Sequence, residues 1–439
     1  MIKGNNKARF DQLIKAAPIF GKLLSAVASD AHFLRKAIEP VAADDAFFHE
    51  LLNMHQAIHE SGKALRTPLL IMRTDFMDDA RLGPQLIEFN GIAAGMGPFG
   101  QRAHELHRYL QTQQDQTFAK WSQTSSLELI PNPAIARLAQ GIVFAANTIK
   151  KHSNEPGPTK FLMVVQENED NIFDQHLLEK QLHLLGIETY RRTFKQLHRA
   201  LSTGDNDRLV LEGVGGIDTV YLRAGYQYCD YLAEDIDQQK CCDTLMKTRI
   251  FIEQHRVAVN ATVSQQLATS KRVQTLLTSM TAEQLLTFGL TEQEAKMIQP
   301  LLGDMRPIDA KSYDFIQADD VSNWVLKNQG EGGGHCIFDK EIPYKLKTLT
   351  PEQYPTWALM RRIHPTPRAI PALVVRDGEP HVVHDLINEI GLFTVHMSGS
   401  PATADNGYAG YLVRSKAATT TEGGVHSGLG VLDSLAYND

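Results

Sequence analysis

The chain has 439 residues, enough for two or three packed units, and carries 44 Lys and Arg against 51 Asp and Glu, a formal net charge of −7 at pH 7. This slightly acidic balance contains no polybasic block, which argues against nucleic acid or an anionic membrane as the main partner. The four cysteines form no Cys-x-x-Cys pair and no apolar run approaches the ~18 residues of a membrane span, so we expect a cytoplasmic protein without a zinc site or disulfides.

The first part of the chain is predicted to be helical. Between about residues 10 and 60, apolar residues recur at three- and four-residue steps, which is typical of helix faces that pack into a core. A short buried strand, residues 68–72, follows and is expected to end at Arg73. A second strand is predicted for residues 85–90.

Two polar residues on this second strand form a candidate metal site. Glu88 and Asn90 are two positions apart, so on a strand both side chains point to the same face. A carboxylate and an amide oxygen side by side are suitable ligands for Mg²⁺, although a solvated strand face produces the same pattern. The loop from Gly91 to Gly100 is rich in small residues, which would let a ligand approach the backbone.

Two amphipathic helices are predicted next, over residues 101–121 and 133–151. The second has Asn132 as its expected N-cap and Pro133 at its first position. Residues 153–158 are rich in Pro, Gly and polar side chains and are interpreted as a linker.

Beyond this linker the pattern changes to strand, helix and strand. A buried strand over residues 160–165, a helix that ends near Gly186 and a strand over residues 188–192 predict an inserted α/β unit with a parallel sheet. Ligands of such sheets bind beyond the carboxyl ends of the strands.

Polar residues gather at these predicted strand ends. Glu169, Asn171 and Gln175 follow the first strand, and Arg223 follows a further strand over residues 219–222. An arginine can grip a substrate carboxylate through two parallel hydrogen bonds, and Glu169 can take a substrate ammonium. A helical section is predicted from about residue 230 to residue 302.

The glycine-rich stretch after residue 323 is the sharpest local signal. A short strand, residues 324–326, delivers Lys327, and Glu331 then precedes Gly332, Gly333 and Gly334. Bare glycines expose backbone N–H groups to phosphate oxygens, a lysine adds a point charge and a carboxylate is a ligand for Mg²⁺. The stretch matches neither a Walker loop nor a kinase glycine loop, and the alternative to nucleotide binding is a flexible surface loop.

The last part of the chain is predicted to be rich in strands. A strand over residues 356–360 and a hairpin around Asp377 and Gly378, whose second arm continues to about residue 393, precede a strand over residues 411–417. Arg414 and Lys416 share a face of that last strand, and the glycine loop after it can offer N–H groups to a small carboxylate. A merely mobile C-terminus is the alternative.

Several of these motifs occur together in one family. Arg73-Thr-Asp-Phe-Met77, Glu88-Phe-Asn90, Asn171-Ile-Phe-Asp-Gln175 and the Lys327 to Gly334 stretch resemble the eukaryotic-type glutathione synthetases of the ATP-grasp superfamily in sequence and order. The resemblance implies an α/β (α+β) protein with the permuted ATP-grasp fold of that family, an inserted parallel-sheet substrate domain and a glycine-rich lid. It implies a main body of residues 1–158, 266–325 and 385–439, an insert of residues 159–265 and a lid of residues 326–384.

The resemblance also implies roles for particular residues. Arg73 and Lys327 would be catalytic, and one or two Mg²⁺ ions would be bound by Glu88, Asn90 and Glu331. ATP would be contacted by Lys271, Lys327, Gly332, Gly333, Gly334, Met360, Ile363, Glu389, Lys416 and Glu422. The other substrates would be contacted by Arg73, Ala93, Gly95, Glu169, Asn171, Gln175, Arg223, Tyr226, Arg414, Val425 and His426.

The implied activity is the ATP-dependent joining of γ-glutamylcysteine and glycine through an acyl phosphate, in a homodimer. Ala93 and Gly95 stand where the family has serines that contact the γ-glutamyl substrate, and His426 replaces a small residue. These departures keep open a related ligase that acts on another γ-glutamyl compound or another amine. A protein that binds nucleotide or peptide without catalysis is the third alternative.

Overall fold

The computed structural model describes residues 2–438 except residues 4, 123–126, 154, 234–240, 331–335, 377, 421–423 and 426–427. Within these described ranges no helix is both long enough and apolar enough to cross a membrane. The helices of eight or more residues are α1 (Asn5–Ser29), α2 (Ala31–Ala42), α3 (Ala46–Glu60), α4 (Gly97–Gln113), α5 (Asp115–Ser122), α6 (Ala134–Ser153), α7 (Ile172–Leu184), α9 (Cys241–Glu253), α11 (Lys271–Thr278) and α15 (Glu341–Thr348). The shorter ones are α8 (Phe194–Leu197), α10 (Val263–Ala268), α12 (Ala282–Leu285), α13 (Glu292–Ile298) and α14 (Ser312–Ala318).

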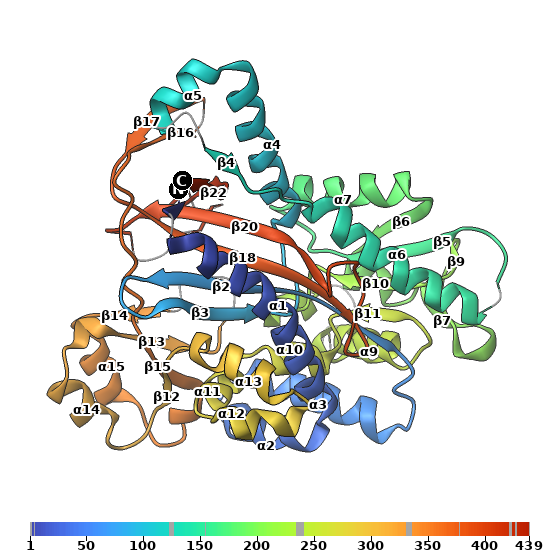
Figure 1. The fold of residues 1–439 in the computed structure, drawn as a ribbon. Coiled ribbons are helices and arrows are strands. Elements are labelled where there is room, and N and C mark those ends of the chain that lie inside the picture. Colours follow the sequence, from blue (N-terminus) through green and yellow to red (C-terminus); the bar gives the residue numbers. More distant parts are fainter. Residues whose placement is uncertain are drawn as a thin grey trace.

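A large mixed sheet forms the centre of the molecule (Figure 1). Its parallel part consists of β2 (Thr67–Asp79), β11 (Ala258–Asn260), β10 (Thr219–Leu222), β5 (Thr159–Val164) and β6 (Ile187–Arg192), paired in this order. Its antiparallel part consists of β3 (Gly83–Asn90), β18 (Leu386–Met397), β19 (Ser400–Pro401), β20 (Tyr408–Ala417) and β21 (Val431–Asp433). The predicted parallel unit is therefore one half of a continuous sheet.

The central strand, β2, is longer than its sequence suggests. The prediction that it ends at Arg73 is wrong, because β2 runs on to Asp79. Its start pairs with β11, its later residues pair with β3, and β18 pairs with it along the opposite edge. The polar residues Arg73 and Asp75 remain in the ladder because their side chains pair with each other above the sheet.

Helices cover both faces of this sheet. Helix α1 lies across one face in Figure 1, where Leu70 and Met72 of β2 belong to its apolar core. Leu69 and Ile71 point to the opposite face and pack with residues of α6. This alternation along β2 is the one expected of a strand buried on both faces.

Four other predictions of elements are corrected by the structure. The section from residue 230 to residue 302 contains a strand, β11, because three residues are too few to produce a detectable period. The helix predicted over residues 101–121 is two helices, α4 and α5, and α4 begins earlier at Gly97. Asn132 does not cap α6, because its side chain pairs with the backbone of β20 instead. The hairpin arm predicted to reach residue 393 ends at Val383, and β18 is a separate strand with other partners.

A second, smaller sheet lies beside the end of β3. It is antiparallel and has the order β12 (Met305–Pro307), β15 (Trp357–Arg361), β13 (Trp324–Asn328) and β14 (Cys336–Phe338). Trp324 and Leu326 of β13 belong to its own apolar core with α14 and α15. Small sheets or ladders elsewhere are formed by β1 (Ile2–Lys3), β22 (Ala436–Asn438) and β4 (Glu128–Leu129), by β7 (Leu201–Thr203), β8 (Leu209–Leu211) and β9 (Gly215–Gly216), and by β16 (Ala372–Arg376) and β17 (Glu379–Val383).

Candidate active site

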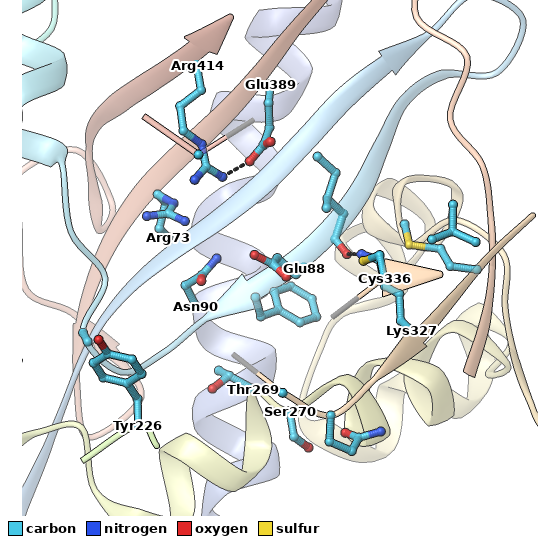
Figure 2. Close-up of a pocket in the computed structure, with 18 of the residues that line it drawn as sticks. Arg73, Glu88, Asn90, Tyr226, Thr269, Ser270, Lys327, Cys336, Glu389 and Arg414 are labelled. Atoms are coloured by element: carbon cyan, nitrogen blue, oxygen red, sulfur yellow. Dashed lines mark hydrogen bonds and ion pairs between the residues drawn. The ribbon is translucent and has the colours of Figure 1, made fainter. Parts of the chain in front are cut away.

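A cavity of about 1190 Å³ opens between the two sheets and the loops that follow β5 and β10. Figure 2 shows its polar residues converging from β2, β3, β13, β18 and β20. Its lining includes most of the residues predicted to bind ligands, namely Arg73, Glu88, Asn90, Ala93, Gly95, Glu169, Asn171, Arg223, Tyr226, Lys327, Met360, Ile363, Glu389, Arg414, Lys416 and Val425. Segments far apart in the sequence thus contribute to one cavity.

Two of the predicted residues that the structure describes, Lys271 and Gln175, are not among those that line the cavity. Lys271 is the first residue of α11 and lies behind Glu88, with its Nζ 3.8 Å from the Glu88 Oε2 and donating to the carbonyl oxygen of Gly330 at 2.8 Å. Gln175 is not among the lining residues, and its side-chain oxygen accepts a hydrogen bond from Arg191 Nη2 at 2.6 Å. The predictions for Glu331, Gly332, Gly333, Gly334, Glu422 and His426 fall outside the described residues.

A β-bulge in β3 lies on the side of the cavity that contains Glu88 and Lys327. The register between β2 and β3 shifts between Asp75 and Phe76, which leaves Ile87 without an opposite residue. The carbonyl oxygen of Ile87 accepts from Lys327 Nζ at 3.4 Å and from Gln274 Nε2 at 3.2 Å. The bulge therefore joins β3 to both the small sheet and α11.

Cations from four elements surround the Glu88 carboxylate. Burial by itself raises the pKa of this carboxyl, but the nearby Lys271, Lys327, Arg414 and Arg73 outweigh it and lower the pKa to about 2. Glu88 is therefore ionised at neutral pH. An ionised carboxylate amid cations can hold a divalent cation, while the same cations attract phosphate.

Glu389 and Arg414 form an ion pair at the other side of the same cluster. The pair joins neighbouring strands, since Glu389 of β18 lies opposite Arg414 of β20. Burial raises the pKa of Glu389, and Arg414 opposes this shift, whereas Asp75 and Glu88 add to it. Burial lowers the pKa of Arg414, but the neighbouring carboxylates raise it above its usual value.

The loop between β3 and α4 is held by side chains from β2, from α7 and from the loop that follows β10. The Ala93 carbonyl oxygen accepts from Arg223 Nη1 at 2.5 Å, and the Gly95 carbonyl oxygen accepts from Arg73 Nη1 at 3.1 Å. Asp174 of α7 accepts from the backbone N–H groups of Met96 and Phe99 at 2.9 and 3.0 Å. Burial raises the pKa of Asp174. The loop between β3 and α4 is thus fixed by contacts with Arg73, Asp174 and Arg223.

Two buried polar atoms beside this loop have no protein partner. Glu169 Oε2 and Arg223 Nε make no hydrogen bond within the part of the chain that the structure describes. Both residues line the cavity. Because buried polar groups are nearly always paired, a carboxylate oxygen and a guanidinium N–H of this kind point to a ligand with a cationic and an anionic group.

Three residues of the site are absent from our sequence-based predictions. Asp75 accepts hydrogen bonds from Arg73, Asn90 and Arg414. Asp174 accepts a hydrogen bond from the backbone of the loop between β3 and α4. Thr269 lines the cavity beside Gly91. The sequence could have indicated that Asp75 lies beside Arg73, because residues two positions apart on a strand share a face.

The residues present fit a divalent cation. No group of three or more His, Cys, Asp or Glu side chains with metal-binding geometry occurs among the described residues. Glu88 and Asn90 nevertheless line the cavity together, and the Asn90 amide nitrogen donates to Asp75 at 3.0 Å, so the amide oxygen is left for another partner. Two oxygen donors suit Mg²⁺, which keeps several water ligands.

This chain is similar to known proteins over almost its whole length. Residues 5–437 match the family model described as eukaryotic glutathione synthase, ATP binding domain. The glutathione synthetase of Homo sapiens is 28% identical over 423 residues, covering 94% of this chain and 84% of that protein. The chloroplastic glutathione synthetase of Solanum lycopersicum is 28% identical, covering 98% of this chain and 75% of that protein.

A solved structure supports the fold. The structure of a glutathione synthetase-like effector from Globodera pallida, in its apo form, superposes with a TM-score of 0.69 at 16% sequence identity, covering 97% of this chain and 86% of that one. The family resemblance expected from the motifs is confirmed, because the family model spans almost the whole sequence. This chain belongs to the eukaryotic glutathione synthase family.

Proposed function

We propose that this protein joins γ-glutamylcysteine and glycine, with ATP, to give glutathione, ADP and phosphate. Membership of the family supports this activity. The observation that carries the proposal is the single cavity in which the oxygens of Glu88 and Asn90 lie among Lys327, Arg73 and Arg414. Such a site can bind a nucleotide with its cation beside a carboxylate substrate.

The chemistry requires a phosphorylated intermediate. A carboxylate is not attacked by an amine at neutral pH, so one of its oxygens must first become a leaving group. Transfer of the γ-phosphoryl group of ATP to that oxygen gives an acyl phosphate and ADP. The glycine amine then forms the new C–N bond and loses a proton, while the C–O bond to phosphate breaks.

Arg73 is the residue we assign to the reacting carbonyl. It lines the cavity, and its guanidinium is fixed in place by Asp75 and the Gly95 carbonyl oxygen. A fixed cation stabilises the charge that develops as the tetrahedral intermediate forms. Loss of one such group typically slows the reaction about 10²- to 10³-fold.

The nucleotide is assigned to the side of the cavity next to the small sheet. We assign Lys327 and Lys271 to the phosphates of ATP, and Met360 and Ile363 to its adenine. Glu389 and Lys416 are assigned to further contacts with ATP. The glycines Gly332, Gly333 and Gly334, together with Glu422, are assigned to ATP from the sequence alone. Glu88, Asn90 and Glu331 are assigned to one or two Mg²⁺ ions. Bound Mg²⁺ would neutralise the charge of the phosphates.

The γ-glutamyl substrate is assigned to the other side of the cavity. Its α-carboxylate and α-ammonium suit Arg223 and Glu169, whose unpartnered atoms lie there. Further contacts are assigned to Arg73, Ala93, Gly95, Asn171, Tyr226, Arg414 and Val425, which line the cavity, and to Gln175 and His426. Gln175 would act only after a change of side-chain position.

The finer architecture is also a proposal. We assign the permuted ATP-grasp arrangement of the family, with a body of residues 1–158, 266–325 and 385–439, an insert of residues 159–265 and a lid of residues 326–384. The small sheet has an apolar core of its own, which also includes Ile308, Ile316 and Trp324 from outside the assigned lid. A homodimer and a cytoplasmic location are proposed from the family and the composition.

The decisive experiment measures ADP release with γ-glutamylcysteine and a series of amines. We expect release with glycine and much less without any amine. Stimulation only by another amine, such as β-alanine, would favour the related ligase suggested by Ala93 and Gly95. Absence of ADP release with every γ-glutamyl compound and amine would contradict the proposed activity.

A further inference from the structure

A buried carboxylate, Asp75, lies between the side chains of Arg73, Asn90 and Arg414, although it lines no part of the cavity. Its side chain is 0% exposed, and both of its oxygens accept hydrogen bonds. Oδ1 accepts from Arg73 Nε at 2.6 Å. Oδ2 accepts from Arg73 Nη2 at 2.7 Å, from Asn90 Nδ2 at 3.0 Å and from Arg414 Nη2 at 3.2 Å. One carboxylate therefore fixes the relative positions of three residues that do line the cavity.

The contact with Asn90 decides which way that amide faces. An ionised carboxylate can only accept hydrogen bonds, so the atom of Asn90 next to Asp75 must be its nitrogen. The amide oxygen is consequently turned away from Asp75. Since Glu88 lies two residues before Asn90 and lines the same cavity, this orientation offers the oxygen and the Glu88 carboxylate to one ligand.

The opposite strand leaves room for this arrangement. Gly391 of β18 lies directly across from Asp75 in the ladder. A Cβ atom at Gly391 would lie 2.6 Å from Asp75 Oδ1 and 2.7 Å from Arg73 Cδ, distances that force the pair to move. The bare Cα of Gly391 thus permits the Arg73–Asp75 pair to lie flat over β18.

We propose that Asp75 is a positioning residue of the active site. It orients the Asn90 oxygen toward a divalent cation and holds Arg73 and Arg414 beside the reacting carboxylate, without itself contacting either ligand. The inference rests on the proposed function for the identity of the cation and of the reaction. Removal of a residue that hydrogen-bonds to a metal ligand typically lowers metal affinity or activity by about 10- to 100-fold.

The first test is the variant Asp75→Asn, with Mn²⁺ as the probe. The variant places an amide N–H₂ against the donors of Arg73, Asn90 or Arg414, so the Asn90 amide loses its fixed orientation. We expect the affinity for Mn²⁺ in the presence of ADP, measured from the EPR signal of the free ion, to fall about tenfold or more. In steady state the half-saturating Mg²⁺ concentration should rise and kcat should fall.

The matched control is Asp218→Asn. Asp218 is also 0% exposed and also paired with an arginine, at 2.7 Å from Arg208, but it does not line the cavity. Its variant should lose stability without a change in Mn²⁺ affinity. An equal loss of Mn²⁺ affinity in both variants would reduce Asp75 to a structural role and overturn the proposal.

Two further variants keep the test decisive. In an Asn90→Ala background the added Asp75→Asn change should no longer weaken Mn²⁺ binding, because its effect passes through Asn90. If Asp75→Asn does not fold, Gly391→Ala displaces the same carboxylate while every polar group is retained, and it should also weaken Mn²⁺ binding. Unchanged Mn²⁺ affinity in the folded variant overturns the proposal. Failure of the proposed ligase activity would appear separately, as absent ADP release by the wild-type protein that still binds Mn²⁺.

Discussion

At the scale of single residues, charge is the main organising factor of this site. Lys271, Lys327, Arg73 and Arg414 come from a helix and three strands, yet all four lower the pKa of Glu88. A carboxylate that stays ionised amid cations is suited to binding a metal ion, and the excess of cations is suited to phosphate. The arrangement therefore has a measurable dependence on pH.

The first prediction concerns Glu88→Gln. The pKa of Glu88 is about 2 in the folded protein and has its ordinary value of 4.5 in the unfolded chain. A depressed pKa stabilises the fold above the unfolded value, and this contribution is lost as the pH falls from 4.5 through 2. The variant should therefore be less stable by about 3 kcal/mol at pH 7 and by about half of that at pH 3.

Urea unfolding at pH 7, 5 and 3 measures this difference. The control is Glu283→Gln on α12, an exposed glutamate, for which the free energy of unfolding should change little at each pH. A difference between wild type and Glu88→Gln that stays constant with pH would show that the cations do not act on the Glu88 carboxylate.

The second prediction concerns Gly95→Ser. A Cβ atom at Gly95 would lie 2.6 Å from Arg223 Nη2, and Arg223 is only 5% exposed, so its guanidinium has little room to move. Although the family carries a serine here, we expect this variant to displace Arg223 and to raise the KM for γ-glutamylcysteine about tenfold, the effect of losing one charge-assisted hydrogen bond. The KM for ATP serves as the internal control and should not change. A lower KM for γ-glutamylcysteine would refute this assignment of Arg223.

At the scale of elements, single side chains join strands to helices across the core. Asn132, just before α6, donates to the Tyr411 carbonyl oxygen at 2.7 Å and accepts from the Tyr411 N–H at 3.0 Å. Its side chain is 4% exposed, so water does not replace these bonds. The contact ties the helix layer to β20, the strand that carries Arg414 and Lys416.

The third prediction follows from this contact. Asn132→Ala leaves a buried N–H and a buried carbonyl without partners, at a cost of about 1–3 kcal/mol each. We expect the free energy of unfolding to fall by about 2–6 kcal/mol, measured by urea denaturation. Asn147→Ala on the exposed side of α6 is the control and should cost less than about 0.5 kcal/mol. Equal effects of the two substitutions would contradict the structural role of Asn132.

At the scale of the whole molecule, the cavity lies where the large sheet and the small sheet meet. The small sheet contributes Lys327 and Met360, and the large sheet contributes Arg223 through the loop after β10, Arg73 from β2 and Arg414 from β20. The Gln329 side-chain oxygen accepts from the backbone N–H of Arg272 at 2.8 Å, which joins the small sheet to α11. A ligand in this cavity would therefore hold the large sheet and the small sheet together.

The fourth prediction is a thermal shift. A non-hydrolysable ATP analogue with Mg²⁺ binds only the assembled cavity, so the melting temperature should rise as its concentration increases. At 100 times its Kd the analogue should add about 2.7 kcal/mol to the free energy of unfolding. Lys327→Met should lose most of this shift. The control Lys347→Met removes a lysine on α15 that does not line the cavity, and it should keep the shift. Loss of the shift in both variants, or in neither, would contradict the assignment of Lys327 to phosphate.

The sequence by itself determined the family and the order of most elements, and most of the described residues that it assigned to ligands line the cavity. A motif such as Glu88-Phe-Asn90 is local, because the spacing along a strand sets which side chains share a face. The strand β11, the full length of β2 and the pairing of Asn132 with Tyr411 depend on partners remote in sequence, so no local pattern predicts them.

Only the tertiary structure decided how these groups act on one another. The four cations around Glu88, the bulge that exposes the Ile87 carbonyl oxygen and the place of Asp75 between two arginines arise from register and packing between strands. Electrostatic interactions depend on distance and burial, which a linear sequence does not contain. The sequence therefore names the chemical groups, and the fold sets their charge states and directions.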